Sequence, residues 1–392
     1  MHVIRAQQVF DGARFLGAAD VVLGATSIVS VSAPTEYAAD VVVEDLGDVT
    51  VLPGLVDAHQ HVTWDCSFDA VGWHERHDDE VLLERARANA RQALAAGVTT
   101  VRDLGGRGRA PFDLRDECSR DPTAGPTLLV AGPALTTPGG HCWFLGGQCQ
   151  GSDDLVAAVA RLEEAGVDVI KVMATGGNLT PGSAPHESQF GLAELRAVVD
   201  AAHAAGLPVA AHAHGTQGVS DALDARVDTI EHCSFMTADG VAEDPALIRR
   251  LAGSGMTVSI TGGTIPGPVP PAIAVRLPAL HAHGRRMLDA GVRCIMATDA
   301  GIGPAKPHDV LPRTVQHAVD DLGATVHQAL AMCTAQAAEA LGLGDRAGRL
   351  RPGVPADLLV VPGRVDHDPS AMRHPIRVLR AGVTVQPRLG TS

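Results

Sequence analysis

Residues 192–214, LAELRAVVDAAHAAGLPVAAHAH, contain the repeating unit from which the fold is predicted. A helical pattern over Leu192–Ala205 ends at Gly206 and is followed by a short apolar strand, Val209–Ala211, which runs into His212. Glycine at that position supplies the left-handed backbone with which many helices end. A helix joined this closely to a buried strand is typical of parallel α/β sheets.

The same unit recurs before and after this stretch, and aliphatic rather than aromatic residues (3% of the chain) must fill the core. The predicted strands are Leu55–Ala58, Thr99–Asp103, Thr127–Ala131, Val167–Val172, Val209–Ala211, Asp228–Glu231, Thr257–Ile260 and Arg293–Ala297. The predicted helices are Glu80–Ala96, Phe112–Arg120, Ser152–Ala165, Leu192–Ala205, Thr216–Ala225, Pro245–Ser254, Pro278–Ala290 and Pro312–Leu322. Alternating strands and helices in this number predict an α/β fold of the TIM (β/α)8 barrel type.

The two ends of the chain have a different pattern, with short β segments and turns. These segments are Met1–Gln7, Asp20–Leu23, Ser27–Ser32, Asp40–Asp45, Ala356–Val361 and Val378–Val385. Because neither end can bury a core alone, we expect both to pair into one small β-sandwich. The predicted domains are residues 1–52 plus 346–392 for this accessory unit and 53–345 for the barrel, with a helix over Thr325–Leu341 connecting them.

The bulk composition restricts the partners and the compartment. A net charge of −14 without a basic block disfavours nucleic-acid binding. We see no stretch near the ~20 apolar residues of a membrane span, and no signal peptide at the N-terminus. Seven cysteines without a CxxC pair favour free thiols in a reducing cytoplasm. We therefore expect a cytoplasmic protein, and we expect it to be a homo-oligomer.

The strongest local motif is LPGLVDAHQH at residues 52–61. His59 and His61 are two positions apart at the end of an apolar strand, so both imidazoles point to the same face. Two imidazoles on one face can hold a Zn²⁺-like ion. A pair of hydrogen-bonded structural histidines is an equal alternative for this motif alone.

Lys171 stands in the apolar run VIKVM at residues 169–173. Lysine is rarely buried without a partner, and burial lowers its pKa. A neutral amine can react with CO2 to form a carbamate, whose two oxygens can bridge two metal ions. The alternative is a lysine whose amine reaches the barrel rim.

Three further candidates also stand at predicted strand ends. His212 follows the fifth strand, His232 the sixth and Asp299 the eighth. In a parallel barrel these ends meet at one opening, where active sites lie. The six candidates together predict a divalent metal centre made of His59, His61, Lys171, His212, His232 and Asp299.

At this point the chain resembles the amidohydrolase superfamily, and within it the imidazolonepropionase-related and prolidase-like enzymes. The resemblance runs from residues 53–61 to the tail motif GRLRPGVPADL at 348–358, and includes IKVMATGG at 170–177 and IEH at 230–232. It implies two divalent ions, with zinc expected. His59, His61 and Asp299 would hold one ion, His212 (rather than His214) and His232 the other, and an N6-carboxylated Lys171 would bridge them.

Two hypotheses about the reaction follow. Two metals lower the pKa of a bridging water towards ~7, and Asp299 carries its proton to the leaving nitrogen. His141, in TPGGH at 137–141, either stabilises the oxyanion or is a plain loop histidine. His214, Gly177 and Asn178 are the further substrate-binding candidates.

The expected substrate is a small molecule with an amide-type C–N bond, a dipeptide or an N-acyl amino acid. A cyclic amide, a carbamate or another small amide is an alternative. A mononuclear deaminase of the same superfamily is a rival that Lys171 disfavours, and a non-enzymatic binding protein is a rival from another class. In the insert Trp64–Asp79, we expect His74 and His77 to be surface residues rather than ligands.

Overall fold

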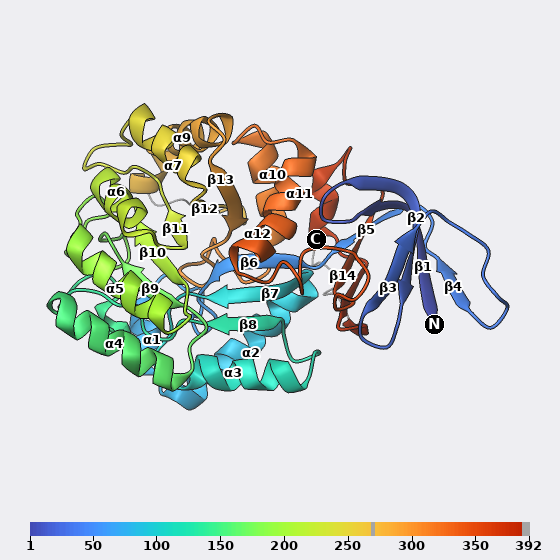
Figure 1. Cartoon of the computed structure of the whole chain (residues 1–392), viewed down its shortest axis with the longest axis horizontal. Helices are drawn as coiled ribbons and strands as arrows, with labels where there is room; N and C mark the ends of the chain where they lie inside the picture. Colours follow the sequence, from blue (N-terminus) through green and yellow to red (C-terminus); the bar gives the residue numbers. More distant parts are fainter. Residues whose placement is uncertain (268–270, 386–392) are drawn as a thin grey trace.

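The computed structural model describes residues 1–267 and 271–385. Figure 1 shows an α/β body built around parallel strands and, at one end, a sheet to which both ends of the chain contribute. Within the described part of the chain, no helix is both long and apolar enough to cross a bilayer. All seven cysteines are free, as the absence of a CxxC pair predicted.

The body contains two parallel sheets, with strand orders β13-β12-β11-β10-β9 and β6-β7-β8. Their strands are β6 (Leu55–Gln60), β7 (Val98–Asp103), β8 (Thr127–Val130), β9 (Ile170–Met173), β10 (Val209–Ala213), β11 (Thr229–His232), β12 (Thr257–Thr261) and β13 (Arg293–Ala297). Each lies at a strand predicted from the sequence, which confirms those eight predictions to within a few residues.

Backbone hydrogen bonds link the two parallel sheets at both edges. The amide of Leu135, beyond the end of β8, donates to the carbonyl of Lys171 in β9 over 2.8 Å. At the opposite edge, the amide of Asp299 donates to the carbonyl of His59 over 2.8 Å. The carboxyl ends of β6, β9, β10, β11 and β13 therefore lie around one region.

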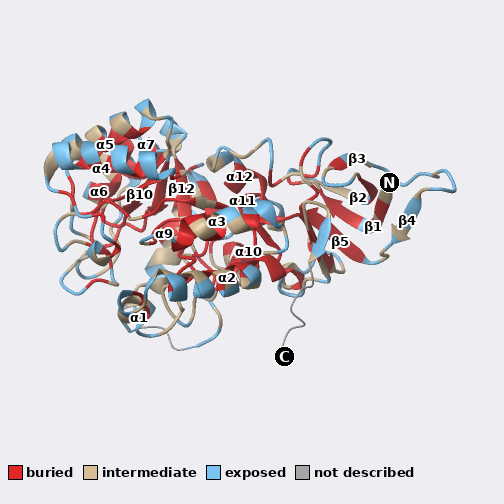
Figure 2. Cartoon of the chain, turned by 90° about the horizontal axis from the view of Figure 1, so that it is seen from below, coloured by how far each residue is buried: buried red, intermediate tan, exposed pale blue. Residues whose placement is uncertain are grey.

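Helices follow the strands and cover them. They are α2 (Asp79–Ala95), α3 (Ala110–Arg120), α4 (Gly151–Ala165), α5 (Leu192–Ala204), α6 (Thr216–Ala225), α7 (Pro245–Ser254), α9 (Leu277–Asp289) and α10 (Leu311–Asp320). Figure 2 shows that the strands are buried while the outer faces of the helices are exposed. The sequence did not predict two short helices, α1 (Ala70–Arg76) and α8 (Pro271–Ala274).

The single helix predicted over Thr325–Leu341 is wrong. The structure has α11 (Val326–Met332) and α12 (Ala335–Ala340), with a break at Cys333 and Thr334. The break frees the carbonyl of Cys333, which accepts a hydrogen bond of 2.9 Å from the amide of Val56 in β6. The helical periodicity of residues 325–341 is unbroken here, so it does not indicate this tertiary hydrogen bond.

Strands from both ends of the chain pair into one mixed sheet, in the order β16-β15-β14-β5-β1-β2-β3, with β4 beside β1. They are β1 (His2–Phe10), β2 (Phe15–Leu23), β3 (Ile28–Ser32), β4 (Val42–Asp45), β5 (Val49–Pro53), β14 (Leu358–Pro362), β15 (Arg377–Arg380) and β16 (Val383–Val385). This sheet buries its own apolar cluster, separate from that of the body. The pairing of the two ends is as predicted. The sandwich geometry stays a prediction, and residues 386–392 of the predicted unit lie outside the described part.

The join between the terminal sheet and the body is Gly54, which separates β5 from β6. A Cβ at this position would lie 2.1 Å from Oγ1 of the buried Thr99, so only glycine fits. We expect Gly54→Ala to lower the free energy of unfolding by about 1–3 kcal/mol through overpacking. Gly253→Ala in α7 is the control, because a Cβ there meets nothing within 4 Å. Equal denaturation midpoints for the two variants would contradict this account.

An ion pair connects the neighbouring strands β1 and β2 of the terminal sheet. Arg5 Nε lies 2.7 Å from the Oδ1 of Asp20, and this guanidinium holds the pKa of Asp20 below its usual value. A carboxyl with a lowered folded-state pKa stabilises the fold above its unfolded pKa and loses that contribution as the pH falls through the folded value. We therefore expect Asp20→Asn to destabilise the protein at pH 7. Urea unfolding should show the difference from wild type shrinking below about pH 4.

Candidate metal centre

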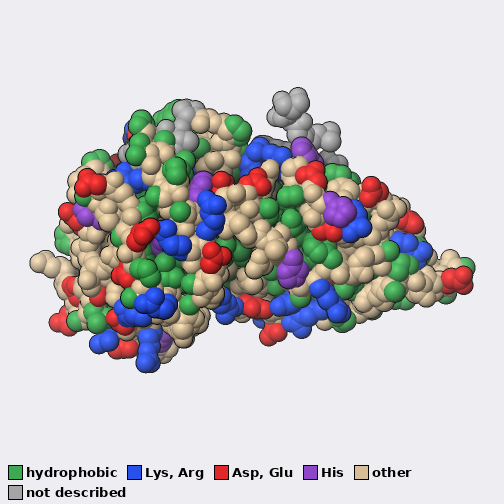
Figure 3. Space-filling model, turned by 90° about the horizontal axis from the view of Figure 1, so that it is seen from above, with side chains coloured by type: hydrophobic (Ala, Val, Ile, Leu, Met, Phe, Trp, Pro, Cys, Tyr) green, Lys and Arg blue, Asp and Glu red, His purple; other side chains and the backbone are tan. Residues whose placement is uncertain are grey.

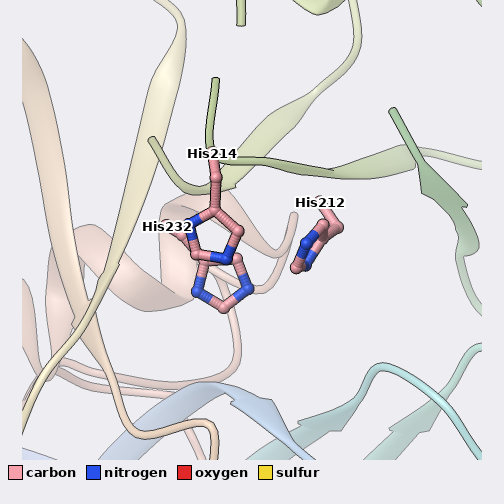
Figure 4. Close-up of side chains that lie close together, drawn as sticks. All are labelled: His212, His214 and His232. Atoms are coloured by element: carbon pink, nitrogen blue, oxygen red, sulfur yellow. The ribbon is translucent and has the colours of Figure 1, made fainter. Parts of the chain in front are cut away.

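The predicted ligands come together at the carboxyl ends of the parallel strands. His59 and His61 belong to the end of β6, Lys171 to β9, His212 to β10, His232 to the end of β11, and Asp299 to the loop after β13. Figure 4 shows the imidazoles of His212, His214 and His232 gathered in one place. Lys171, His59 and His212 are buried.

Two groups of potential ligand atoms overlap at His232. In the first, atoms of His59, His232 and Asp299 lie within 4.8 Å of one another, and in the second those of His212, His214 and His232 do so. The side chain of Asp299 is next to both histidines of β6, since its Oδ1 lies 3.3 Å from Nε2 of His59 and 3.1 Å from Nε2 of His61. The arrangement could hold two neighbouring cations.

Hydrogen bonds on the far side of the rings fix which nitrogen faces the centre. Nδ1 of His59 lies 2.9 Å from the Glu231 carboxylate, and Nδ1 of His61 lies 3.2 Å from the carbonyl of Gly105. Both partners are acceptors, so both Nδ1 atoms carry a proton, and in the neutral form of each ring Nε2 presents a lone pair. The two lone pairs then face the same carboxylate oxygen of Asp299, which is repulsive unless a cation lies between them. Histidine ligands of metals are held in this way.

The ligand from β10 is less clearly assigned. His212 and His214 have ring centroids 4.6 and 4.5 Å from that of His232. Nε2 of His212 lies 3.0 Å from the carbonyl of Gly176, which leaves its Nδ1 to accept, while Nδ1 of His214 lies 2.7 Å from the Ser234 hydroxyl. The choice of His212 as the ligand stays a prediction.

Burial keeps these imidazoles neutral, which is the form that binds metals. It lowers the pKa of His59 and of His214 to about 4, and that of His212 and His232 well below the usual value. No imidazolium in this group would then repel a cation at pH 7.

Lys171 is the group that the protein alone does not satisfy. Its side chain is buried, and its Nζ has no hydrogen-bond partner among the described residues. Burial lowers the pKa of the amine to about 8, although the carboxylates of Glu231 and Asp299 oppose the shift. A buried amine without a partner, close to imidazoles and a carboxylate, fits a carbamate that bridges two cations.

Asp299 adopts a strained backbone conformation, with φ of 60°, as the chain leaves β13. Burial alone would raise the pKa of its carboxyl, and only positive charge beside it, on His59 and His61 or on a cation bound in their place, holds that pKa well below the usual range. The side chain is therefore an anion at neutral pH, with one oxygen directed at both histidines of β6.

Glu231 and Arg102 are the functional residues that the sequence reading missed. Glu231 Oε1 accepts a hydrogen bond of 2.8 Å from Arg102, while its Oε2 faces Nδ1 of His59. Both side chains are buried at the centre of the strands. The available signal was a charged residue within each of two predicted strands, because an unpaired charge is too costly to bury.

The candidate substrate residues lie beside this centre. The ring of His141 is buried 4.7 Å from that of His212, and its Nδ1 lies 3.2 Å from the Thr180 hydroxyl. A Cβ at Gly177 would fall 2.3 Å from Nε2 of His141, so only glycine lets the backbone approach this edge of the ring. Asn178 is exposed, one residue further along. Their roles in substrate binding stay predictions.

The expectation that His74 is a surface residue is wrong. The insert folds into α1, which buries the imidazole against the indole of Trp64, with ring centroids 5.5 Å apart. Its Nε2 lies 3.2 Å from the Thr63 hydroxyl, and burial lowers its pKa to about 3. His77 is partly exposed. Helix α1 has only seven residues, which is too few for an apolar pattern to indicate which of its sides faces the body.

A sequence model of the amidohydrolase family matches residues 50–385. The chain belongs to the amidohydrolase family. This amidohydrolase is 25% identical over 369 residues to ochratoxinase of Aspergillus niger, with 83% of this chain and 74% of that protein covered. It is 29% identical over 354 residues to imidazolonepropionase of Deinococcus deserti, with 81% and 79% covered.

Among solved structures, the amidohydrolase is similar to a Xaa-Pro dipeptidase that has methionine bound in its active site. The TM-score is 0.85 at 26% identity, and the match covers 98% of this chain and 99% of that one. The resemblance inferred from the sequence motifs is thus confirmed. The protein is a hydrolase that acts on carbon–nitrogen bonds of the amide type.

The orientation of His59 by Glu231 can be tested directly. We expect Glu231→Gln to weaken divalent-metal binding by roughly 10–100-fold, because the amide cannot match both Arg102 and the Nδ1–H of His59. Glu243→Gln is the control, since Glu243 pairs with Arg286 in an exposed ion pair. Metal content after dialysis against a competing chelator measures the effect. Retention by Glu231→Gln equal to that of the control would show that Glu231 does not orient a ligand.

Proposed function

We propose that this amidohydrolase uses two divalent metal ions to hydrolyse the amide bond of a dipeptide or an N-acyl amino acid. The observation that carries the proposal is the pair of lone pairs, from His59 and His61, that face one carboxylate oxygen of Asp299 at 3.3 and 3.1 Å. A cation between them turns a repulsive contact into a ligand set. The unpartnered amine of Lys171 supports a second, bridged ion.

In this proposal His59, His61 and Asp299 hold one ion, His212 and His232 hold the other, and carboxylated Lys171 lies between them. Bound zinc ions would supply a lower pKa for water and an electrophile for the amide carbonyl oxygen. Condensation of the Lys171 amine with CO2 requires its neutral form, and the lowered pKa makes that form available near neutral pH.

The protein's own residues would direct the proton and the substrate. Asp299, anionic at neutral pH, accepts a proton from the attacking water and transfers it to the leaving nitrogen. His141 is neutral at pH 7, because burial lowers its pKa to about 3, and its Nε2 lies beside the backbone of Gly177. This imidazole can donate a hydrogen bond to the developing oxyanion. His214 and Asn178 would contact the rest of the substrate.

We also infer that the eight parallel strands close into one (β/α)8 barrel over residues 53–345, with residues 1–52 and 346–392 as a β-sandwich. The hydrogen bonds at both edges of the two sheets support closure. A cytoplasmic location, supported by the free thiols, and a homo-oligomeric state complete the proposal.

The choice of substrate rests on the similar proteins. The similarity to a Xaa-Pro dipeptidase structure at 26% identity favours a dipeptide, in which the group next to the scissile bond is an amino acid. The 29% identity to imidazolonepropionase favours the alternative, a cyclic amide. A mononuclear deaminase is disfavoured, because a site with one metal ion would leave the buried amine of Lys171 without a bonding partner.

The test combines metal analysis with a substrate panel. Zinc-loaded protein should carry two equivalents in the central site and should hydrolyse members of a dipeptide and N-acyl amino acid library. Removal of the metal with a chelator should abolish the activity, and added zinc should restore it. Hydrolysis of cyclic amides alone would favour the alternative, and one equivalent of metal would overturn the binuclear proposal.

Asp299→Asn separates the proton transfer from metal binding. The amide keeps an oxygen as a ligand but cannot accept a proton, so we expect partial retention of metal and a loss of kcat of at least about 100-fold. Steady-state kinetics of the zinc-loaded variant, with its metal content measured in parallel, provides the check. Turnover close to wild type would remove Asp299 from this role.

A further inference from the structure

Two histidines and an aspartate lie together on the outside of the body, away from the centre described above. His281 belongs to α9, His317 to α10, and Asp321 follows the last residue of α10. One potential ligand atom from each lies within 4.8 Å of the other two. Figure 3 looks onto the side that α9 and α10 form in Figure 1, and histidine side chains reach this surface. We propose that these three residues form a separate site for a divalent transition-metal ion such as Zn²⁺.

The distances suit a tetrahedral ion. Nδ1 of His281 lies 3.3 Å from one carboxylate oxygen of Asp321. Ligands about 2.0–2.1 Å from zinc in a tetrahedron are roughly 3.3 Å apart. Nδ1 of His317 lies 2.8 Å from the other oxygen of Asp321, which is a hydrogen bond in the metal-free protein. Binding would replace the proton on this nitrogen by the ion.

The surroundings direct His317 towards this site. A Cβ at Gly262 would lie 2.6 Å from Cδ2 and 3.1 Å from Nε2 of His317, so that edge of the ring packs against the chain after β12. The other edge, with Nδ1, faces Asp321. Burial lowers the pKa of His317, which favours the neutral form that a metal requires.

The charge and exposure of the site also suit a cation. Two neutral imidazoles and one carboxylate around a divalent ion leave a net charge of +1, as in zinc sites with two histidines and one acid. The side chains of His281 and Asp321 are 23% and 40% exposed, which leaves a water to take the fourth position. Lys306, whose charge lowers the pKa of His317, directs its ammonium to the carbonyl of Thr298 at 2.7 Å.

Occupation of this site would tie α9 to the end of α10. It would also restrain Gly262, which packs against the ring of His317. The residue before Gly262 is Thr261, whose hydroxyl lies 2.8 Å from Nδ1 of His232. The outer site is therefore structural: it does not touch the substrate, and it stabilises the rim next to the central site. The proposal stands whether or not the central site hydrolyses amides.

Equilibrium dialysis of the full chain against buffered Zn²⁺, followed by elemental analysis, tests the site. Wild type should hold one more equivalent per chain than His281→Gln and than Asp321→Asn. His203→Gln is the matched control, because His203 pairs with Asp228 at 2.9 Å on the surface but belongs to no group of three potential ligands among the described residues. The control should hold as much zinc as wild type.

Two further readouts separate this ion from those at the centre. Saturating Zn²⁺ should raise the Tm of wild type and of His203→Gln by a few degrees more than that of His281→Gln. Cu²⁺ added to protein already loaded at the centre should give an electron paramagnetic resonance signal with imidazole nitrogen coupling, lost in His281→Gln. Equal zinc content in wild type, His281→Gln and Asp321→Asn would overturn the proposal and leave an imidazole–carboxylate–imidazole hydrogen-bond group.

Discussion

The contact between Arg102, Glu231 and His59 is the constraint on which the centre of this protein depends. Two opposite charges are buried together in the middle of the strands, and each would be prohibitively costly without the other. The second oxygen of Glu231 then fixes the tautomer and the direction of His59. One buried ion pair thus connects β7, β11 and β6, and it sets the geometry of the ligand nearest to Asp299.

Around this ion pair, burial and the lack of hydrogen-bond partners both favour neutral electron-pair donors over charged groups. Burial lowers the pKa of the imidazoles and of the Lys171 amine, so the groups that meet at the strand ends are electron-pair donors rather than cations. Without a bound ion, an amine and several lone pairs would face one another at this site. Enzymes of the amidohydrolase family typically bind metal ions, and the set of donor atoms here is suited to such ions.

Much of the central site could be predicted from the sequence, because its residues are recognised by the two-residue period of β-strands and by their positions in or after predicted strands. The two-residue spacing of His59 and His61 gives a shared face, and a lone Lys171 in an apolar strand is conspicuous. What escaped prediction depends on partners distant in the sequence. Glu231 needs Arg102, the helix break at Cys333 needs Val56, and the burial of His74 needs Trp64. Strand β5 also escaped prediction, because the strands that pair with it, β1 and β14, are distant in the sequence.

The terminal sheet has a consequence for the order in which the chain becomes structured during its synthesis. Thr50 in β5 bonds to Gly363, 313 positions later, and β5 pairs along its length with β14. At ~5–20 residues per second, a ribosome needs roughly 15–60 s to bridge that interval. Throughout this time one edge of β5 has no neighbour and is open to foreign strands. Strand β5, which leaves the ribosome well before β14, is thus completed only after β14 has been made.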